Sequence, residues 1–207
     1  MSLRMLHALS AVVIAAFVSV HIANHLAGLA GPGTHIAFMK AARLVYRNRL
    51  LEVALLGSVA VQIVSGVTLF VRGWKQRHGF VPWLQASSGV FLAFFLIIHV
   101  TSVLFGRAAL HLDTNFYFAS AGLHIAPFQF FLAPYYFLAV VALFTHGACA
   151  AWWQSRSLHR VARILIVAVP MAIGMTLSML IVLSLAGELF PIEIPPEYKA
   201  PYALPRR

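Results

Sequence analysis

The chain has 207 residues, of which 61% are hydrophobic and only 10% are charged, and its formal net charge is +10. Soluble domains carry about 25% charged residues, so a chain of this length cannot hide so much apolar surface in one core surrounded by water. The composition therefore predicts an all-α integral membrane protein and argues against a soluble catalytic module.

Five segments are long and apolar enough to span a membrane as helices, since about twenty residues at a rise of 1.5 Å cross the hydrocarbon layer. The first is too long, and too polar in its interior, for a cleaved signal peptide. We expect one membrane domain over residues 1–207 and an extended, Pro-rich tail over 187–207. The predicted helices cover about residues 6–30, 50–72, 82–106, 128–153 and 164–186.

The positive charge lies in loops, tails and helix ends, where it suits lipid headgroups rather than nucleic acid. Seven cations fall on the N-terminal side of the predicted bundle and eight on the opposite side, so charge alone does not orient the chain. All four tryptophans lie on the N-terminal side, as in an interfacial belt. We expect a bacterial inner-membrane protein with a cytoplasmic N-terminus. The tryptophans are Trp74, Trp83, Trp152 and Trp153.

The single cysteine, Cys149, falls inside the fourth predicted helix. One cysteine forms no intramolecular disulfide and no CxxC redox pair. The sequence therefore excludes the thiol chemistry of quinone-linked disulfide oxidases, and a small buried residue is the simpler interpretation of Cys149.

Histidines inside the predicted helices are candidates for function, because polar side chains are costly there. His21 lies nine residues before the end of the first helix, and His99 seven before the end of the third. Both helices run in the same direction, and two residues correspond to about 3 Å, so the imidazoles lie at matching depth. Facing histidines suit the axial ligation of a haem iron. A hydrogen bond between the two helices is the alternative.

A second polar layer is expected nearer the N-terminal side, around His146 of the fourth helix. The second helix offers Gln62 at comparable depth and no histidine. Glutamine is a poor iron ligand, so three interpretations stay open for this layer. They are a His146–Gln62 hydrogen bond, a five-coordinate haem and a quinone pocket.

Patterns on four consecutive predicted helices carry a family resemblance. They are "SVHIANHLAG" in the first, a glutamine four residues before Gly66 in the second, "LQASSGVFLAFFLIIHV" in the third and "YYFLAVVALFTHGACAAWW" in the fourth. Over about residues 6–153 the chain resembles the five-helix cytochrome b membrane subunit of succinate dehydrogenases and fumarate reductases, the respiratory complex II family. That family has a histidine where this chain has Gln62.

The resemblance implies that the first four helices form a haem-binding bundle. In the family two haems b are stacked across the membrane, each held by two histidines. This places His21 and His99 as axial ligands of the haem far from the dehydrogenase side, and His146 on the near haem. Because Gln62 replaces a ligand, we expect one haem b and leave the second open.

The resemblance also implies electron transfer to or from a membrane quinone. The flavin and iron–sulfur modules of that family would be separate subunits, since the chain has no Gly-rich or Cys-rich motif for them. Whether the chain forms homo-oligomers stays open. Two alternatives remain: a stand-alone haem- or quinone-binding membrane protein, and a metal- or partner-binding membrane module without haem.

Small and polar residues near the predicted ligands suit roles around the haem. Gly66, Ser88 and Gly89 would let a flat macrocycle approach the backbone, although small residues also serve helix packing in lipid. Asn24, one turn from His21, could orient that ligand or a propionate. Glu52, at the start of the second helix, is the candidate proton acceptor beside a quinone, although acids also favour helix N-termini.

Cations after the first helix are candidates for binding the haem propionates, because arginine donates two hydrogen bonds to a carboxylate. They lie on the same side as the His21–His99 layer, and contact with headgroups is the alternative. They are Arg43, Arg47 and Arg49.

A copper or zinc site is the rival from another chemical class. His25 is one turn from His21 and would share one side of the membrane with three loop histidines, His35, His111 and His124. Their spacing matches no strong metal signature. The remaining histidines, His7, His78 and His159, are interpreted as interfacial.

Overall fold

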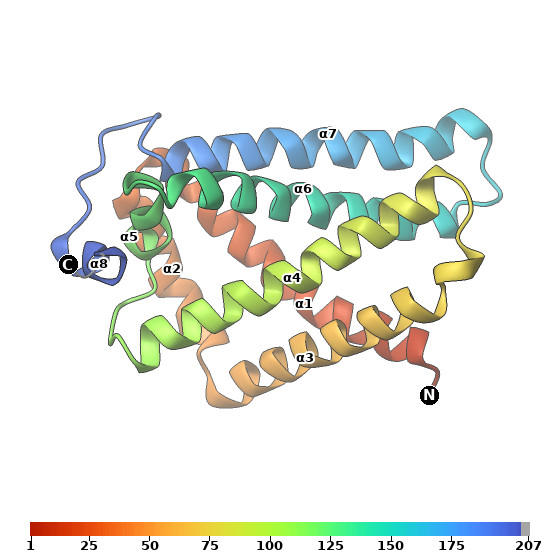
Figure 1. The fold of residues 1–207 in the computed structure, drawn as a ribbon, viewed down its shortest axis with the longest axis horizontal. Coiled ribbons are helices and arrows are strands. Elements are labelled where there is room, and N and C mark those ends of the chain that lie inside the picture. Colours follow the sequence, from red (N-terminus) through yellow and green to blue (C-terminus); the bar gives the residue numbers. More distant parts are fainter. Residues whose placement is uncertain (204–207) are drawn as a thin grey trace.

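The computed structural model describes residues 1–203, and within them it is helical without any strand (Figure 1). Five helices are long and apolar enough to cross a membrane, as the sequence predicts, and only 6% to 28% of their apolar windows is buried inside the chain. Their apolar surface thus faces outward, which suits lipid. They are α1 (Leu3–Ala27, extended by a 3-10 turn to Ala30), α3 (Arg49–Arg72), α4 (Phe80–Ala108), α6 (Gln129–Gln154) and α7 (Arg160–Leu185).

Side-chain caps fix where three of these helices begin. The Ser2 hydroxyl accepts from the Met5 N–H, the Asn48 side chain from the Leu50 N–H, and His159 Nδ1 from the Ala162 N–H. Each cap satisfies one of the backbone donors that a helix N-terminus leaves without an intrahelical partner.

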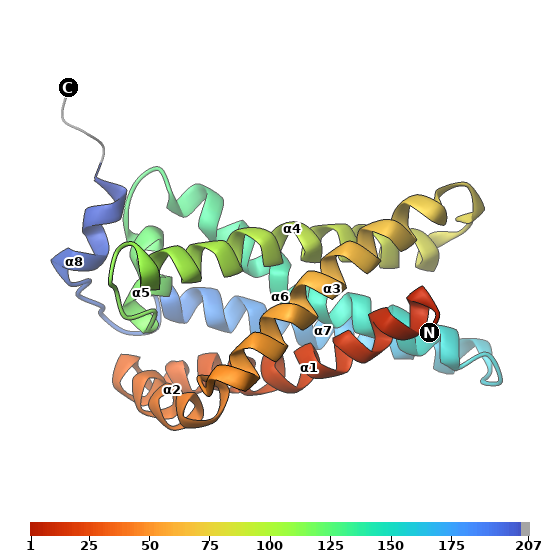
Figure 2. The ribbon, with the colours of Figure 1, turned by 90° about the horizontal axis from the view of Figure 1, so that it is seen from below.

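Residues 32–46 form a helix, α2 (Pro32–Tyr46), where the sequence predicts only a connection between two spanning helices. Proline at its first turn suits a helix start, because that position needs no backbone donor. α2 folds back beside the end of α1, as Figure 2 shows. It buries His35 and Met39, one turn apart, and leaves Leu44 84% exposed.

The long helices form a bundle in which α1 and α4 lie across from each other. α1 packs against α3, α3 against α4, α4 against α6 and α6 against α7, whereas α1 and α4 have little direct contact. The closest pair, α6 and α7, meets at small residues: a Cβ added to Gly174 would lie 2.7 Å from Phe144 Cβ, and Ser178 donates to the Phe137 carbonyl at 2.7 Å. Small residues allow this approach.

Short elements close the end of the bundle opposite the N-terminus. They are α5 (Phe116–Ser120) and α8 (Pro196–Lys199). Phe116 of α5 belongs to a small buried core with Leu123, in the 3-10 turn after α5, and Leu185, at the end of α7. The predicted extended tail is therefore wrong in part, since α8 and a 3-10 turn to Tyr202 are helical. Tyr198 is buried and accepts a hydrogen bond from Asn115. Residues 204–207 lie outside the described residues.

Candidate functional site

Four histidines from three helices meet at the end of the bundle opposite the N-terminus, and we call this group the far layer. Ring centroids are 4.7 Å apart for His21 and His25, 5.3 Å for His25 and His35, and 6.0 Å for His21 and His99. α1 supplies His21 and His25, α2 supplies His35 and α4 supplies His99. The matching depth predicted for His21 and His99 is thus borne out by their proximity.

Aromatic neighbours hold the two predicted ligands. Phe17, one turn before His21, stacks on its ring at 5.6 Å, and Phe95, one turn before His99, stacks at 4.9 Å. Both imidazoles are partly exposed although they point into the bundle. Their flat faces are thereby fixed while part of each ring stays accessible.

The separation of His21 and His99 fits one metal ion between them. A metal–imidazole bond is about 2 Å long, and a ring nitrogen lies roughly 1 Å from the centroid of its ring. Two imidazoles on one metal therefore have centroids about 6 Å apart. The observed 6.0 Å lies close to this value, and it separates rings on helices with little direct contact.

Several buried polar atoms in the far layer and in the adjacent Asn24 have no hydrogen-bond partner among residues 1–203. The Asn24 amide donates to His35 Nε2 at 3.0 Å, but its carbonyl oxygen is unpaired. The Nδ1 atoms of His25 and His35 are also unpaired. Buried polar atoms without partners are costly, so they mark a place where a ligand or water would be favourable.

His35 is the far-layer histidine that lies outside the five long helices. Burial, with smaller contributions from the nearby His21 and Arg43, lowers its pKa to about 4. At neutral pH its imidazole is therefore uncharged, and it can accept the hydrogen bond from Asn24.

Three arginines gather beside the far layer in a hollow of about 520 Å³, together with His111. Arg43 forms an ion pair with Asp113 at 2.6 Å. The pKa of Arg47 is lowered by burial and by its cationic neighbours Arg43 and Arg107. Two of the three predicted propionate arginines, Arg43 and Arg47, are thus brought together.

The third cation of the hollow comes from another helix. Arg49 does not line the hollow, and its place is taken by Arg107 from the end of α4. Arg107 also forms an ion pair with Glu52, the predicted proton acceptor. The role of Glu52 beside a quinone stays a prediction.

Polar side chains nearer the N-terminus form a second group, the near layer, made of His7, Ser10, Gln62, Ser65, Gln85, Ser88 and His146. Here the Gln62 amide donates to His7 Nε2 at 3.0 Å, and its carbonyl accepts from Ser10 at 2.7 Å. His7 Nδ1 then donates to Ser65 Oγ at 2.8 Å. Gln62 is thus paired with His7, and the alternative of a His146–Gln62 hydrogen bond is wrong.

His146 is held by α4 rather than by α3. Its Nδ1 lies 3.0 Å from the Gln85 carbonyl and 3.3 Å from Ser88 Oγ. Gly89 makes room for the ring, because a Cβ there would lie 2.9 Å from His146 Cε1. Gly66 does the same for His7, with 3.2 Å to Cε1. The three small residues predicted to face a macrocycle, Gly66, Ser88 and Gly89, contact histidines instead.

His7 is the residue that sequence reasoning misplaced, as an interfacial histidine. It lies fourteen residues before His21, which is close to four helical turns. That spacing puts both histidines on one face of α1, and it could have indicated that His7 faces the bundle. His7 faces α3 inside the bundle, next to the fully buried Ser65.

The rival metal group is brought together only in part. His35 lies beside His25, but His111 lines the arginine hollow and His124 bonds the Leu185 carbonyl at 3.0 Å. Among the described residues, no group of three or more His, Cys, Asp or Glu side chains is arranged to hold a metal ion.

Comparisons of the chain with family models, curated proteins and solved structures find no match.

Proposed function

We propose that this protein is a membrane-spanning cytochrome that binds one haem b between His21 and His99 and passes electrons to or from a membrane quinone. The observation that carries the proposal is the 6.0 Å separation of the two imidazoles, which come from helices with little contact of their own. The five long apolar helices support a place in the membrane.

The residues around the far layer fit this ligand. His21 and His99 would hold the iron, while Phe17 and Phe95 keep their rings in place. The unpaired carbonyl of Asn24 is available to orient a ligand. Arg43 and Arg47, with Arg107, would neutralise the propionates in the adjoining hollow.

The proposed electron transfer follows from the chemistry of haem. When bound, a haem with two histidine ligands supplies reversible one-electron transfer. The chain's own contribution is to keep the two imidazoles aligned between aromatic side chains. The resemblance to complex II membrane subunits supports a quinone as electron partner and separate flavoprotein and iron–sulfur subunits.

An absorption spectrum of the purified protein tests the proposal. We expect the narrow visible bands of a low-spin haem b after reduction, and about one haem per chain by the pyridine haemochrome assay. Loss of the oxidised form on mixing with a reduced quinone would establish the electron partner. Protein that carries no haem after expression with a haem precursor, and takes up none when haem is added, would overturn the assignment. Metal analysis of the same sample would then test the rival copper or zinc site.

A further inference from the structure

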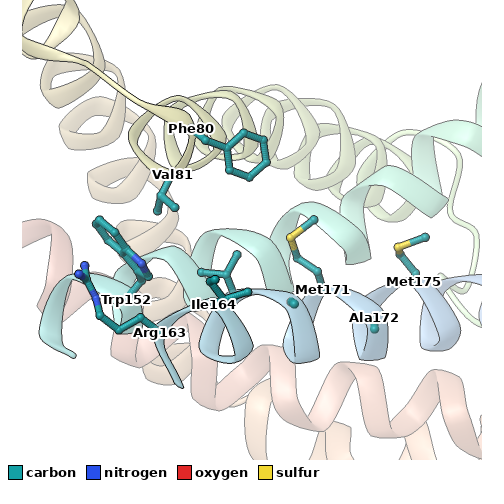
Figure 3. A pocket seen from close by; sticks show the side chains of 10 residues that line it. Phe80, Val81, Trp152, Arg163, Ile164, Met171, Ala172 and Met175 are labelled. Carbon is teal, nitrogen blue, oxygen red and sulfur yellow. The ribbon is translucent and has the colours of Figure 1, made fainter. Parts of the chain in front are cut away.

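An apolar groove of about 370 Å³ opens on the N-terminal side of the bundle, where α4 begins, α6 ends and α7 begins (Figure 3). Its volume is in the range of ligand pockets. It lies at the opposite end of the bundle from the far layer. Its lining includes Phe80, Trp152, Arg163, Ala168, Ala172 and Met175.

One cation stands among otherwise apolar side chains. The Arg163 guanidinium lies over the Trp152 ring, 4.0 Å from its centroid. Its Nε atom is buried and has no hydrogen-bond partner within residues 1–203. The lining contains no acidic side chain to neutralise it. An anion at the mouth of the groove would neutralise the charge of this guanidinium.

The groove continues from Arg163 along α7 toward the middle of the bundle. Met171 and Met175 lie eight and twelve residues further on, which corresponds to about 12 and 18 Å. Ala168 and Ala172 leave space between them, and Met175 and Phe80 are 50% and 74% exposed. The groove is therefore open along its side to surrounding lipid and long enough for part of an acyl chain.

We propose that this groove binds an anionic phospholipid, with the phosphate on Arg163 and one acyl chain along α7. A quinone suits the site less well, because its neutral head has no need of an unpaired guanidinium and the lining offers no acid or histidine to exchange a proton. The proposal is independent of haem binding.

Two other arginines provide matched controls. Arg156 lies over the Trp153 ring at 5.4 Å and is not part of the lining. Arg160, the first residue of α7, is exposed and also outside the lining. Neutralising either removes one charge from the same side of the protein without touching the groove.

Quenching of Trp152 by brominated lipids tests the proposal in reconstituted full-length protein. The protein is placed in phosphatidylcholine vesicles that contain a small share of brominated phosphatidylglycerol or brominated phosphatidylcholine. The signal of a Trp152→Phe variant is subtracted to isolate Trp152. We expect the brominated anionic lipid to be preferred by about fivefold, the effect of one arginine on an anionic lipid.

Arg163→Gln should remove this preference, whereas Arg156→Gln and Arg160→Gln should keep it. Ala168→Phe, which fills the groove, should reduce quenching by both lipids, and Ala60→Phe on the exposed surface of α3 should not. Equal quenching by the two lipids in the unmodified protein, or a preference that survives Arg163→Gln, would overturn the proposal. Displacement of the brominated lipids by a long-chain quinone in both the unmodified protein and Arg163→Gln would assign the groove to quinone instead.

Discussion

The near and far layers both place histidines from several helices inside one bundle, yet they satisfy them differently. In the near layer His7 and His146 each bond protein groups through Ser65, Gln62 and the Gln85 carbonyl. In the far layer His21 and His99 have aromatic neighbours and, within residues 1–203, no hydrogen-bond partner. Polar groups that lack a protein partner are stabilised by binding a ligand or water. The comparison therefore favours the far layer over the near layer as the site of the proposed haem.

Removing one far-layer ligand should have the largest effect. His21→Ala or His99→Ala would delete one of the two proposed axial nitrogens, so we expect loss of the six-coordinate, low-spin haem spectrum. His146→Ala is the matched control, because it deletes a buried histidine of the near layer and should leave that spectrum intact. Full wild-type spectra in both far-layer variants would show that the ligands lie elsewhere.

Overfilling the near layer should have the next largest effect. Gly89→Ala places a Cβ 2.9 Å from His146 Cε1 and pushes the ring from the Gln85 carbonyl. We expect a loss of about 1–3 kcal/mol in the free energy of unfolding, measured by denaturant titration in detergent. Gly57→Ala is the control, since nothing lies within 4 Å of its added Cβ, and it should be neutral or slightly stabilising. Equal stability of the two variants would contradict the contact.

The length and order of the five helices could be predicted because hydrophobic length is a local property of the sequence. The depth of His21 and His99 could be predicted for the same reason, since the helix rise is constant. The sequence did not predict the helix α2 or the position of His35 beside His25. The Gly31-Pro32 pair suggests a break, but the proline begins a helix that packs back on α1.

Contacts between helices could not be predicted, because they depend on which faces meet. Arg107 lies at the end of α4, and it lines the same hollow as Arg43 only because of how the helices are arranged. Gln62 bonds His7 rather than His146 because α3 packs mainly on α1. The resemblance to complex II subunits predicted that α3 and α6 face each other in the near layer, through Gln62 and His146. The structure pairs α1 with α3 and α4 with α6 there.

Removing the amide of Gln62 should have a smaller effect than overfilling. Gln62→Ala leaves His7 Nε2 without its partner and removes one of the two acceptors of the Ser10 hydroxyl. We expect a loss of about 1–2 kcal/mol in the free energy of unfolding. Ser58→Ala is the control on the same helix, because Ser58 only bonds the Ala54 carbonyl. A double-mutant cycle with His7→Ala should show coupling between the two positions. Additive losses would mean that the two side chains do not interact.

Acidification should have the smallest effect, and it tests whether His35 is held neutral. Burial, with the nearby His21 and Arg43, lowers the pKa of His35 from its ordinary value of 6.5 to about 4. The unfolded chain therefore binds a proton more readily than the folded one. The stability contributed by neutral His35 is therefore complete above pH 6.5 and is lost as the pH falls toward 4. Between pH 6.5 and about pH 5.5 the loss is about 1 kcal/mol. We expect His35→Gln, which cannot take up that proton and can still bond Asn24, to show a loss smaller by this amount in denaturant titrations at the two pH values. His78→Gln, at an exposed histidine outside the layers, should retain the full loss, and identical pH profiles of His35→Gln and the unmodified protein would show that His35 is not held neutral.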